Sequence, residues 1–313
     1  MPFNIIYLSH GGKKYYDQTR FSVLSLLHLL IEQQRQDIHI VVYTDSLESV
    51  PQHPLIQAIA IEKSQLAAYR GRFDYVHRIK LEVLQRASLE VGTPLLYVDC
   101  DSRWRSLPDE LFARLQINLP NQQQVGCMHV LEGQFCPEFF PEYQQAVEMF
   151  GPQLRALGVR DTSHLAMWNA GAIGVPAGAD HFFTQALAIN DFLLPRVNAR
   201  NWIEQFALSL VACSRFRMEA LDQALHHYWN YSYEAPIYLN EIFAAMAPDW
   251  DVTRQAKYCA QLSWDESRLK QIQSAPEHKA LRRSNKRRNS LYKRKIDLRI
   301  ALVRLGLRLT RQF

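Results

Sequence analysis

The feature that most constrains the fold is a series of short, mainly apolar segments separated by amphipathic ones. Four of them are predicted to be buried strands: NIIYLS (4–9), DIHIVVYTD (37–45), IQAIAIE (56–62) and PLLYVD (94–99). Residues 16–34 and 74–90 place apolar side chains at helical spacing. Strands that are apolar on both faces need cover on both sides. The alternation therefore predicts an α/β fold with a doubly wound, mostly parallel, Rossmann-like sheet flanked by helices.

The middle of the chain is less regular, and residues 236–265 follow no clear pattern. The expected elements are a strand at 125–130, a helix within 138–151 after Pro141, a turn leading into a strand at 164–176, and a helix at 202–212.

Composition places the chain among soluble globular proteins. Hydrophobic residues make up 48% and charged residues 21%, and no segment reaches the roughly 18 consecutive apolar residues of a membrane-spanning helix. The N-terminal apolar run is short and lacks a basic start, so a first strand is expected there rather than a signal peptide. Five cysteines without a CxxC pair favour a reducing cytosol over a disulfide framework or a zinc site.

The charge distribution divides the chain in two. Of its 36 Lys and Arg residues, 13 lie between residues 278 and 313, where the one acid is Asp297. In the segment 296–309, leucines share one helical face and arginines lie on another: Leu298, Leu302, Leu305 and Leu309, and Arg304, Arg308 and Arg311. We therefore predict a catalytic domain at 1–270 and a basic amphipathic tail at 271–313. The tail is expected to bind an anionic membrane surface. Nucleic-acid binding and packing on another subunit are the alternatives.

The segment PLLYVDCDSRW (94–104) carries the strongest functional signal. A strand runs directly into Asp99 and Asp101, and in strand geometry residues two apart point to the same side. Two carboxylates this close repel each other, and unpaired charges in a partly buried site are costly. A hard cation such as Mg²⁺ or Mn²⁺ removes the conflict, and substrate phosphates commonly complete its ligands. Loop aspartates that cap a following helix are the alternative, but parallel sheets bind ligands at this end of their strands.

Two motifs resemble those of GT-A-fold nucleotide-sugar glycosyltransferases, in particular a glycogenin-like, family 8-like group from bacteria. YVDCD resembles the DxD motif, whose aspartates hold a metal that bridges the donor diphosphate, and WNAGAIGVP resembles a stretch beside the donor sugar. The resemblance covers residues 3–230 and implies a UDP-sugar donor and Mn²⁺ or Mg²⁺ as cofactor. It also implies that Asn169 binds sugar hydroxyls and that Gly171 lets the backbone approach the ligand closely.

The resemblance implies further donor contacts, each on a residue type that a strand-end turn or a helix surface also uses. Ser9 resembles the residue that contacts the nucleoside, Tyr16 is placed to stack on the base, and Asp45 resembles an acid near the nucleoside. Arg78 and Lys80 precede the DxD motif, where the family often places a cation for the phosphates. Of these two, Lys80 is preferred.

A late histidine often supplies the third metal ligand in this fold. HHYWN offers His226 and His227, which point apart in regular structure, and the sequence HYW favours His227. A hydrogen-bonded structural histidine is the alternative. WIEQFALS resembles the acid-Gln helix start of these enzymes, which makes Glu204 the candidate catalytic carboxylate, either as a general base or as a group that orients the sugar. Because the commoner start is Asp-Gln, Asp191 remains a rival.

The sequence therefore predicts a hexosyltransferase-type enzyme that acts in polysaccharide biosynthesis. It would transfer a sugar from a nucleotide sugar to a hydroxyl of a glycan or a lipid-linked acceptor, in the cytoplasm at the inner face of the cell membrane. One alternative is a nucleotidyltransferase acting on a sugar phosphate, although the early His-Gly-Gly turn lacks the longer Gly-rich and basic loop of such enzymes. The other is a nucleic-acid-binding protein that uses the basic tail, but nucleic acid is not the expected partner.

Overall fold

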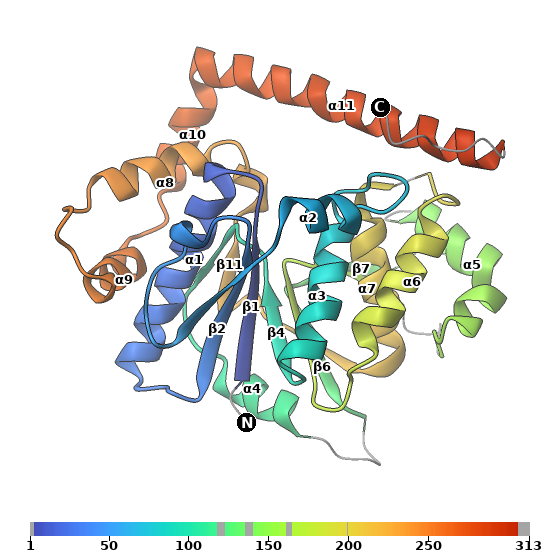
Figure 1. Cartoon of the computed structure of the whole chain (residues 1–313), viewed down its shortest axis with the longest axis horizontal. Coiled ribbons are helices and arrows are strands. Elements are labelled where there is room, and N and C mark those ends of the chain that lie inside the picture. The colour runs from blue at the N-terminus through green and yellow to red at the C-terminus, as the bar shows by residue number, and fades with distance from the viewer. Residues whose placement is uncertain (1–2, 118–122, 135–139, 161–164, 199, 306–313) are drawn as a thin grey trace.

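The centre of the molecule is a mostly parallel sheet of seven strands. The computed structural model describes residues 3–117, 123–134, 140–160, 165–198 and 200–305 (Figure 1). The strand order is β10-β6-β9-β4-β1-β2-β3. The strands are β1 (Phe3–Ser9), β2 (Ile38–Thr44), β3 (Ile56–Ala60), β4 (Leu95–Val98), β6 (Val125–Met128), β9 (Ala172–Val175) and β10 (Arg217–Ala220). Within this sheet β9 runs antiparallel to β4 and β6, and the other pairings are parallel.

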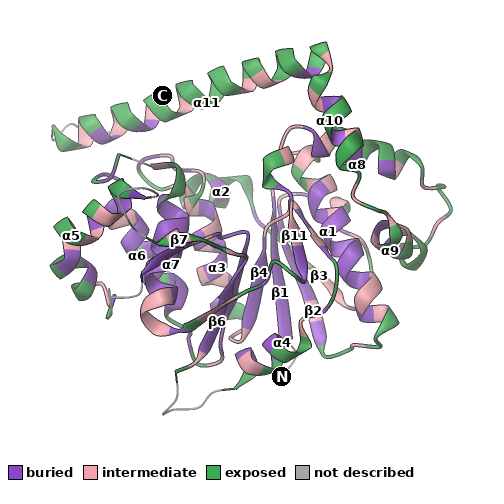
Figure 2. Ribbon diagram, turned by 180° about the vertical axis from the view of Figure 1, so that it is seen from behind, coloured by how far each residue is buried: buried purple, intermediate pink, exposed green. Residues whose placement is uncertain are grey.

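Helices cover both faces of this sheet because its strands are apolar on both sides. In β1, Ile5 and Tyr7 belong to one core cluster, and Ile6 and Leu8 belong to another. The helices on the first side are α1 (Lys13–Glu32) and α4 (Asp109–Gln116), and those on the second are α3 (Arg78–Glu90), α6 (Phe182–Leu193) and α7 (Ile203–Arg215). Figure 2 shows the central strands buried and the outward sides of the helices exposed, whereas the edge strands β3 and β10 hold half-buried and exposed residues. The predicted fold class is therefore confirmed.

The remaining elements surround this core. Two small sheets pair β5 (Ser102–Trp104) with β11 (Leu225–His227), and β7 (Leu131–Gln134) with β8 (Ala166–Trp168). The other helices are α2 (Lys63–Tyr69), α5 (Pro141–Ala156), α8 (Ala235–Ala244), α9 (Val252–Gln261), α10 (Glu266–Ser274) and the short η1 (Leu47–Ser49), η2 (Arg200–Trp202) and η3 (Trp229–Tyr231).

Most predicted elements are present, with three differences. The strand expected to be buried at 56–62 is β3, whose residues are half-buried or exposed because it lies at the edge of the sheet. Residues 164–176 hold two strands, β8 and β9, where one was expected, because the turn between them sends the chain into a different sheet. Residues 236–265, which followed no pattern, contain most of α8 and all of α9, whose apolar residues pack on α1. Cys100, Cys127, Cys213 and Cys259 are free thiols, and Cys136 lies outside the described residues.

The basic C-terminal segment forms one long helix, α11 (Pro276–Arg304), which crosses the molecule beyond the carboxyl ends of the parallel strands (Figure 1). A helix was expected only from residue 296, and the structure shows that the polar stretch before it is helical as well. Arg308, Leu309 and Arg311 lie outside the described residues. None of the described helices combines the length and the apolar character that crossing a membrane requires.

Contacts along its length hold α11 to the body. Near its start, His278 Nε2 lies 2.8 Å from Glu234 Oε1, and both side chains are buried. Nearer its end, Ile296 and Ile300 are buried in the main core. Leu298, predicted for the apolar face, is 59% exposed and points outward. The helix therefore packs on the body through its isoleucines, and the domain boundary at residue 270 stays a prediction.

Replacing Ile296 and Ile300 together by alanine is expected to detach the second half of α11, because each buried isoleucine-to-alanine change costs about 2–5 kcal/mol. Trypsin should then cut the Lys- and Arg-rich helix about tenfold faster or more, since cleavage follows the population of the open form. Leu298→Ala, at an exposed position of the same helix, is the control. Equal cleavage of the double variant and the control would show that the isoleucines do not hold α11.

Candidate active site

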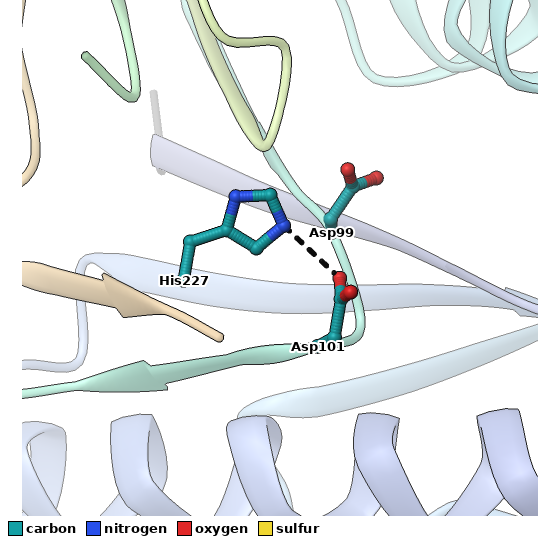
Figure 3. Close-up of side chains that lie close together, drawn as sticks. All are labelled: Asp99, Asp101 and His227. Carbon is teal, nitrogen blue, oxygen red and sulfur yellow. Dashed lines mark hydrogen bonds and ion pairs between the residues drawn. The ribbon is translucent and has the colours of Figure 1, made fainter. Parts of the chain in front are cut away.

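The two aspartates of the DxD motif lie in the turn that follows β4. The strand ends one residue before Asp99, and β5 begins at Ser102. The expectation that strand geometry extends through Asp101 is therefore wrong. Two hydrogen bonds shape the turn: Asp99 N donates to Gly171 O at 2.8 Å, and Ser102 Oγ donates to Asp99 O at 2.7 Å. The turn, rather than strand alternation, brings both carboxylates beside His227 (Figure 3).

His227 is the third member of this cluster. It ends β11, where it lies opposite Ser102 in the antiparallel pairing with β5. Its Nε2 is 3.2 Å from Asp101 Oδ1, and one ligand atom from each of the three residues lies within 4.8 Å of the others. The neighbouring His226 is turned away, with its Nδ1 2.7 Å from Arg105 Nη2. Of the two candidate histidines, His227 is therefore the one in the cluster.

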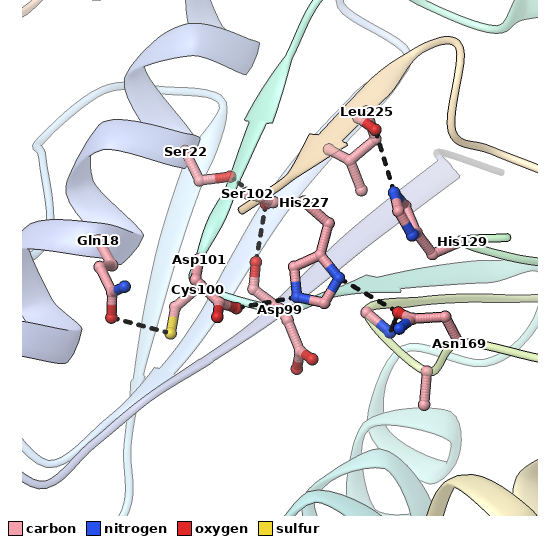
Figure 4. A network of polar contacts seen from close by, with 12 residues as sticks. Gln18, Ser22, Asp99, Cys100, Asp101, Ser102, His129, Asn169, Leu225 and His227 are labelled. Carbon is pink, nitrogen blue, oxygen red and sulfur yellow. Dashed lines mark hydrogen bonds and ion pairs between the residues drawn. The ribbon is translucent and has the colours of Figure 1, made fainter. Parts of the chain in front are cut away.

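A second contact orients the imidazole of His227. Its Nδ1 lies 3.1 Å from Asn169 Oδ1, which is an acceptor, so Nδ1 carries a proton and Nε2 faces Asp101 (Figure 4). Gly171 makes room for the ring, because a Cβ at this position would come within 2.2 Å of His227 Nδ1. The imidazole thus requires glycine here, and the predicted approach of Gly171 to a ligand stays a prediction.

The cluster fits a hard divalent cation. Burial favours the neutral forms, but attraction between the two groups and their hydrogen bond outweigh it, so the pKa of His227 is raised and the pKa of Asp101 is lowered. Mn²⁺ or Mg²⁺ can be coordinated by two carboxylates and one imidazole, here with the second imidazole nitrogen hydrogen-bonded. Coordination by Nε2 requires that the proton on this nitrogen has left. Within the described ranges, no other group of three or more His, Cys, Asp or Glu residues has this proximity.

Lys80 of α3 joins the DxD motif to the predicted catalytic carboxylate. Its Nζ lies 3.1 Å from Asp99 and 3.0 Å from Glu204, and it donates to Ala170 O at 3.1 Å. Burial lowers the pKa of Lys80, but the two carboxylates outweigh it, and the pKa is raised. For Glu204, burial raises the pKa and Lys80 lowers it, and the effect of burial is the larger, so the pKa of Glu204 is raised. Lys80 is therefore a permanent cation between two acids.

A hydrogen-bond network holds the turn between β8 and β9. Asn169 Nδ2 donates to Glu132 Oε1 at 2.7 Å, and Asn169 Oδ1 accepts from Gly171 N at 2.9 Å. Gln205 of α7 donates to Glu132 Oε2 at 2.8 Å and accepts from Ala170 N at 3.2 Å. Sequence reasoning missed Glu132, an exposed acid on a short strand that belongs to no recognisable motif. The role of Asn169 toward sugar hydroxyls stays a prediction.

The cluster borders a cavity of about 680 Å³ at the carboxyl ends of β1, β2 and β4. Asp99, Asp101 and Lys80 line it, as does Asp45 at the end of β2. Its volume lies within the range of small-molecule sites, about 300–1,000 Å³. Several polar and aromatic lining residues were not predicted from the sequence: His10, Lys14, Tyr15, Lys63, Arg70 and His77.

The predicted nucleoside contacts occupy different places around this cavity. Asp45 accepts hydrogen bonds from the hydroxyl of Tyr16 at 2.8 Å and from Gly11 N at 3.3 Å. Tyr16 itself lines a neighbouring hollow, and Tyr15 lines the main cavity. Ser9 is fully buried and is not among the lining residues. Sequence patterns fix the start of a helix to one or two residues, which is too coarse to decide which tyrosine faces inward.

Asp191, the rival catalytic acid, lies in α6 outside the cluster. Its carboxylate accepts from Arg78 Nε at 2.8 Å and from Arg78 Nη2 at 2.9 Å, and Arg78 also pairs with Glu82. Arg78, the alternative to Lys80, is thus engaged with α6 rather than with the DxD motif. The structure brings Lys80 and Glu204 to the cluster and leaves Arg78 and Asp191 apart from it.

Comparison with known proteins finds similar solved structures but no matching family model or curated sequence. One similar solved structure is mouse xyloside xylosyltransferase 1 in its apo form, with a TM-score of 0.44, 12% identity and coverage of 71% of this chain and 86% of that one. Another is the galactosyltransferase LgtC in complex with donor and acceptor sugar analogs, with a TM-score of 0.42, 11% identity and coverage of 70% and 73%.

Lys80→Met is expected to destabilise the fold, because it leaves Glu204 buried without its counter-charge, and breaking buried pairs costs about 3–5 kcal/mol. Adding Glu204→Gln to the same chain should restore much of the loss, since the uncompensated charge is then absent. Urea unfolding of the wild type, both single variants and the double variant measures the coupling. Additive effects of the two substitutions would contradict the ion pair.

Proposed function

We propose that the protein is a metal-dependent glycosyltransferase of the GT-A type, which transfers a sugar from a nucleotide sugar to a hydroxyl of a glycan or a lipid-linked acceptor. The observation that carries the proposal is the cluster of Asp99, Asp101 and His227 beside a cavity of nucleotide size. A site in which carboxylates hold a hard cation suits a substrate with a diphosphate, because the phosphates supply further oxygen ligands.

The lining of the main cavity supports a nucleoside diphosphate donor, with UDP as the preferred nucleotide. Asp45 offers an acceptor for ribose or base, and Tyr15, 41% exposed, offers an aromatic face for stacking. Lys14 and Arg70 add cations that can meet phosphate oxygens. These groups and the Asp99 carboxylate line the same cavity, which allows one donor molecule to contact all of them.

The residues around the cluster have distinct parts in the proposed transfer. A bound Mn²⁺ or Mg²⁺ would supply Lewis-acid stabilisation of the negative charge on the departing diphosphate. Lys80 stays protonated and adds a fixed cation at the same edge of the cavity. Glu204 is the proposed catalytic carboxylate, either as the base that deprotonates the acceptor in an inverting reaction or as the group that orients the sugar in a retaining one. We favour it over Asp191 because Lys80 joins Glu204 to Asp99, whereas Asp191 is paired with Arg78 outside the cluster.

We further propose that α11 docks on the anionic inner face of the cell membrane. Leu291, Leu298 and Leu305 are 65%, 59% and 74% exposed, and residues seven apart lie on one side of a helix. The segment 278–313 carries 13 basic residues and one acid. Exposed leucines on a basic helix suit a lipid surface with negative head groups, and docking there would bring a lipid-linked acceptor to the site.

Calorimetric titration of UDP and of GDP, each with Mn²⁺ and with EDTA, tests the proposed donor site. We expect UDP to bind only with metal. Asp99→Ala and Asp101→Ala should lose this binding and the transferase activity while keeping the fold, because each removes a ligand of the cation. Asp249→Ala, at an exposed aspartate outside the site, is the control. Full activity in either DxD variant, or UDP binding that is equal in EDTA, would contradict the metal site.

The membrane proposal predicts that the wild type floats with vesicles containing phosphatidylglycerol and not with neutral vesicles. Replacing Leu291 and Leu298 together by glutamate should weaken flotation about tenfold or more, because burial of each leucine contributes about 1.5–3 kcal/mol. Leu89→Glu, at a leucine of α3 that is 75% exposed, is the matched control. Wild-type protein that stays in the soluble fraction with both vesicle types would refute membrane docking.

A further inference from the structure

A second cavity, of about 480 Å³, lies between α11 and the body. Three parts of the chain converge on it: residues 75–77 ahead of α3, Arg200 and Asn201 ahead of α7, and residues 289–297 of α11. In Figure 1, α11 passes above α2 and α3, and its residues 289–297 form one wall of this cavity. The cavity exists because the basic helix is docked, and no residue of the DxD motif lines it.

This second cavity adjoins the proposed donor cavity. Val76 and His77 line both, so the two spaces share a wall. Arg200 and Asn201 belong to η2, which continues directly into the first turn of α7, where the proposed catalytic residue Glu204 lies. The hydroxyl of Tyr75 donates to Arg200 O at 2.8 Å, which ties the wall beside α3 to η2. A ligand in the second cavity therefore lies next to both the donor site and the catalytic segment.

The walls of the second cavity are held in place by specific contacts. The hydroxyl of Tyr292 accepts from Val76 N and donates to Asp74 O, each at 2.7 Å. Arg200 forms an ion pair with Asp297 of α11, and Ile296 is buried in the core beneath. The cavity is thus a built pocket between two fixed surfaces rather than a gap beside a loose helix.

The chemistry of the lining suits a neutral polyhydroxylated ligand. Asn198, Asn201 and Asn289 bring three side-chain amides, all on solvent-exposed residues of the lining. An amide both donates and accepts, which matches pairs of sugar hydroxyls, and the half-buried Tyr292 adds aromatic surface. Arg200 is paired with Asp297, and among the residues that the structure describes Lys293 is the lining cation without an ion-pair partner. A diphosphate would need more cations than this.

We infer that the second cavity is the subsite in which the acceptor binds, and that it takes a sugar ring of that acceptor. That the bound sugar belongs to the acceptor rests on the proposed glycosyltransferase function. The binding of a saccharide to this cavity stands independently on its lining. Residues of α11 thus complete the acceptor subsite, so the basic helix has a role in substrate binding in addition to the proposed membrane docking.

Saturation-transfer-difference NMR tests this inference with the full chain in the presence of UDP and Mg²⁺. The probes are the methyl α- and β-glycosides of glucose and of galactose. Asn289→Trp fills the cavity, Asn201→Ala removes one amide, and Asn285→Trp, on α11 outside the lining, is the matched control. We expect saturation transfer to at least one glycoside in the wild type. It should fall about tenfold in Asn201→Ala, as for the loss of about 1.4 kcal/mol of hydrogen bonding. It should disappear in Asn289→Trp and persist in the control.

Three results would overturn the inference: no transfer to any probe in the wild type, equal transfer in Asn289→Trp and the wild type, or equal loss in the Asn285→Trp control. Calorimetry of UDP on the same four proteins separates this inference from the proposed function. UDP affinity should be unchanged in all variants. Failure of the wild type to bind UDP, together with glycoside binding that depends on Asn289, would refute the donor site and leave the saccharide site in place.

Discussion

Two carboxylates at the end of a buried strand are the constraint on which the rest of the site depends. Asp99 and Asp101 are offset by different partners, Lys80 on one side and His227 on the other. Each partner is held by a further contact. Glu204 pairs with the buried Lys80, and the side-chain oxygen of Asn169 orients the imidazole of His227. A divalent cation completes this charge balance in the proposed function, and it explains why the site draws on segments far apart in the chain.

The mostly parallel sheet delivers these groups to one edge. β4 carries the DxD turn, and β2, on the far side of β1, leads to Asp45, while the antiparallel β9 begins just after the turn that holds Asn169 and Gly171. The long α11 then crosses beyond the same edge and forms one wall of the second cavity, which adjoins the first through Val76 and His77. In the proposed function the donor takes the cavity beside the metal cluster, and in the further inference the acceptor sugar takes the second cavity.

The sequence predicted the sheet and the centre of the site because both depend on local patterns. Apolar strands that end in acids identified Asp99 and Asp101, and the HYW motif selected His227 over His226. The second layer of the site was harder to predict. Glu132 lies on a short exposed strand without a motif, and the choice between Tyr15 and Tyr16 depends on the rotation of α1. The packing of α11 through Ile296 and Ile300, which leaves Leu298 outward, depends on the tertiary surface beneath the helix and has no signal in the sequence.

An anomalous difference map from crystals grown with Mn²⁺ and UDP would locate the cation directly. We expect one strong manganese peak bounded by carboxylate oxygens of Asp99 and Asp101 and by Nε2 of His227, at ligand distances of about 2.0–2.3 Å. We also expect the UDP diphosphate at the same ion, with the uridine toward Asp45. A peak elsewhere, or UDP bound without metal at this cluster, would contradict the proposed metal site.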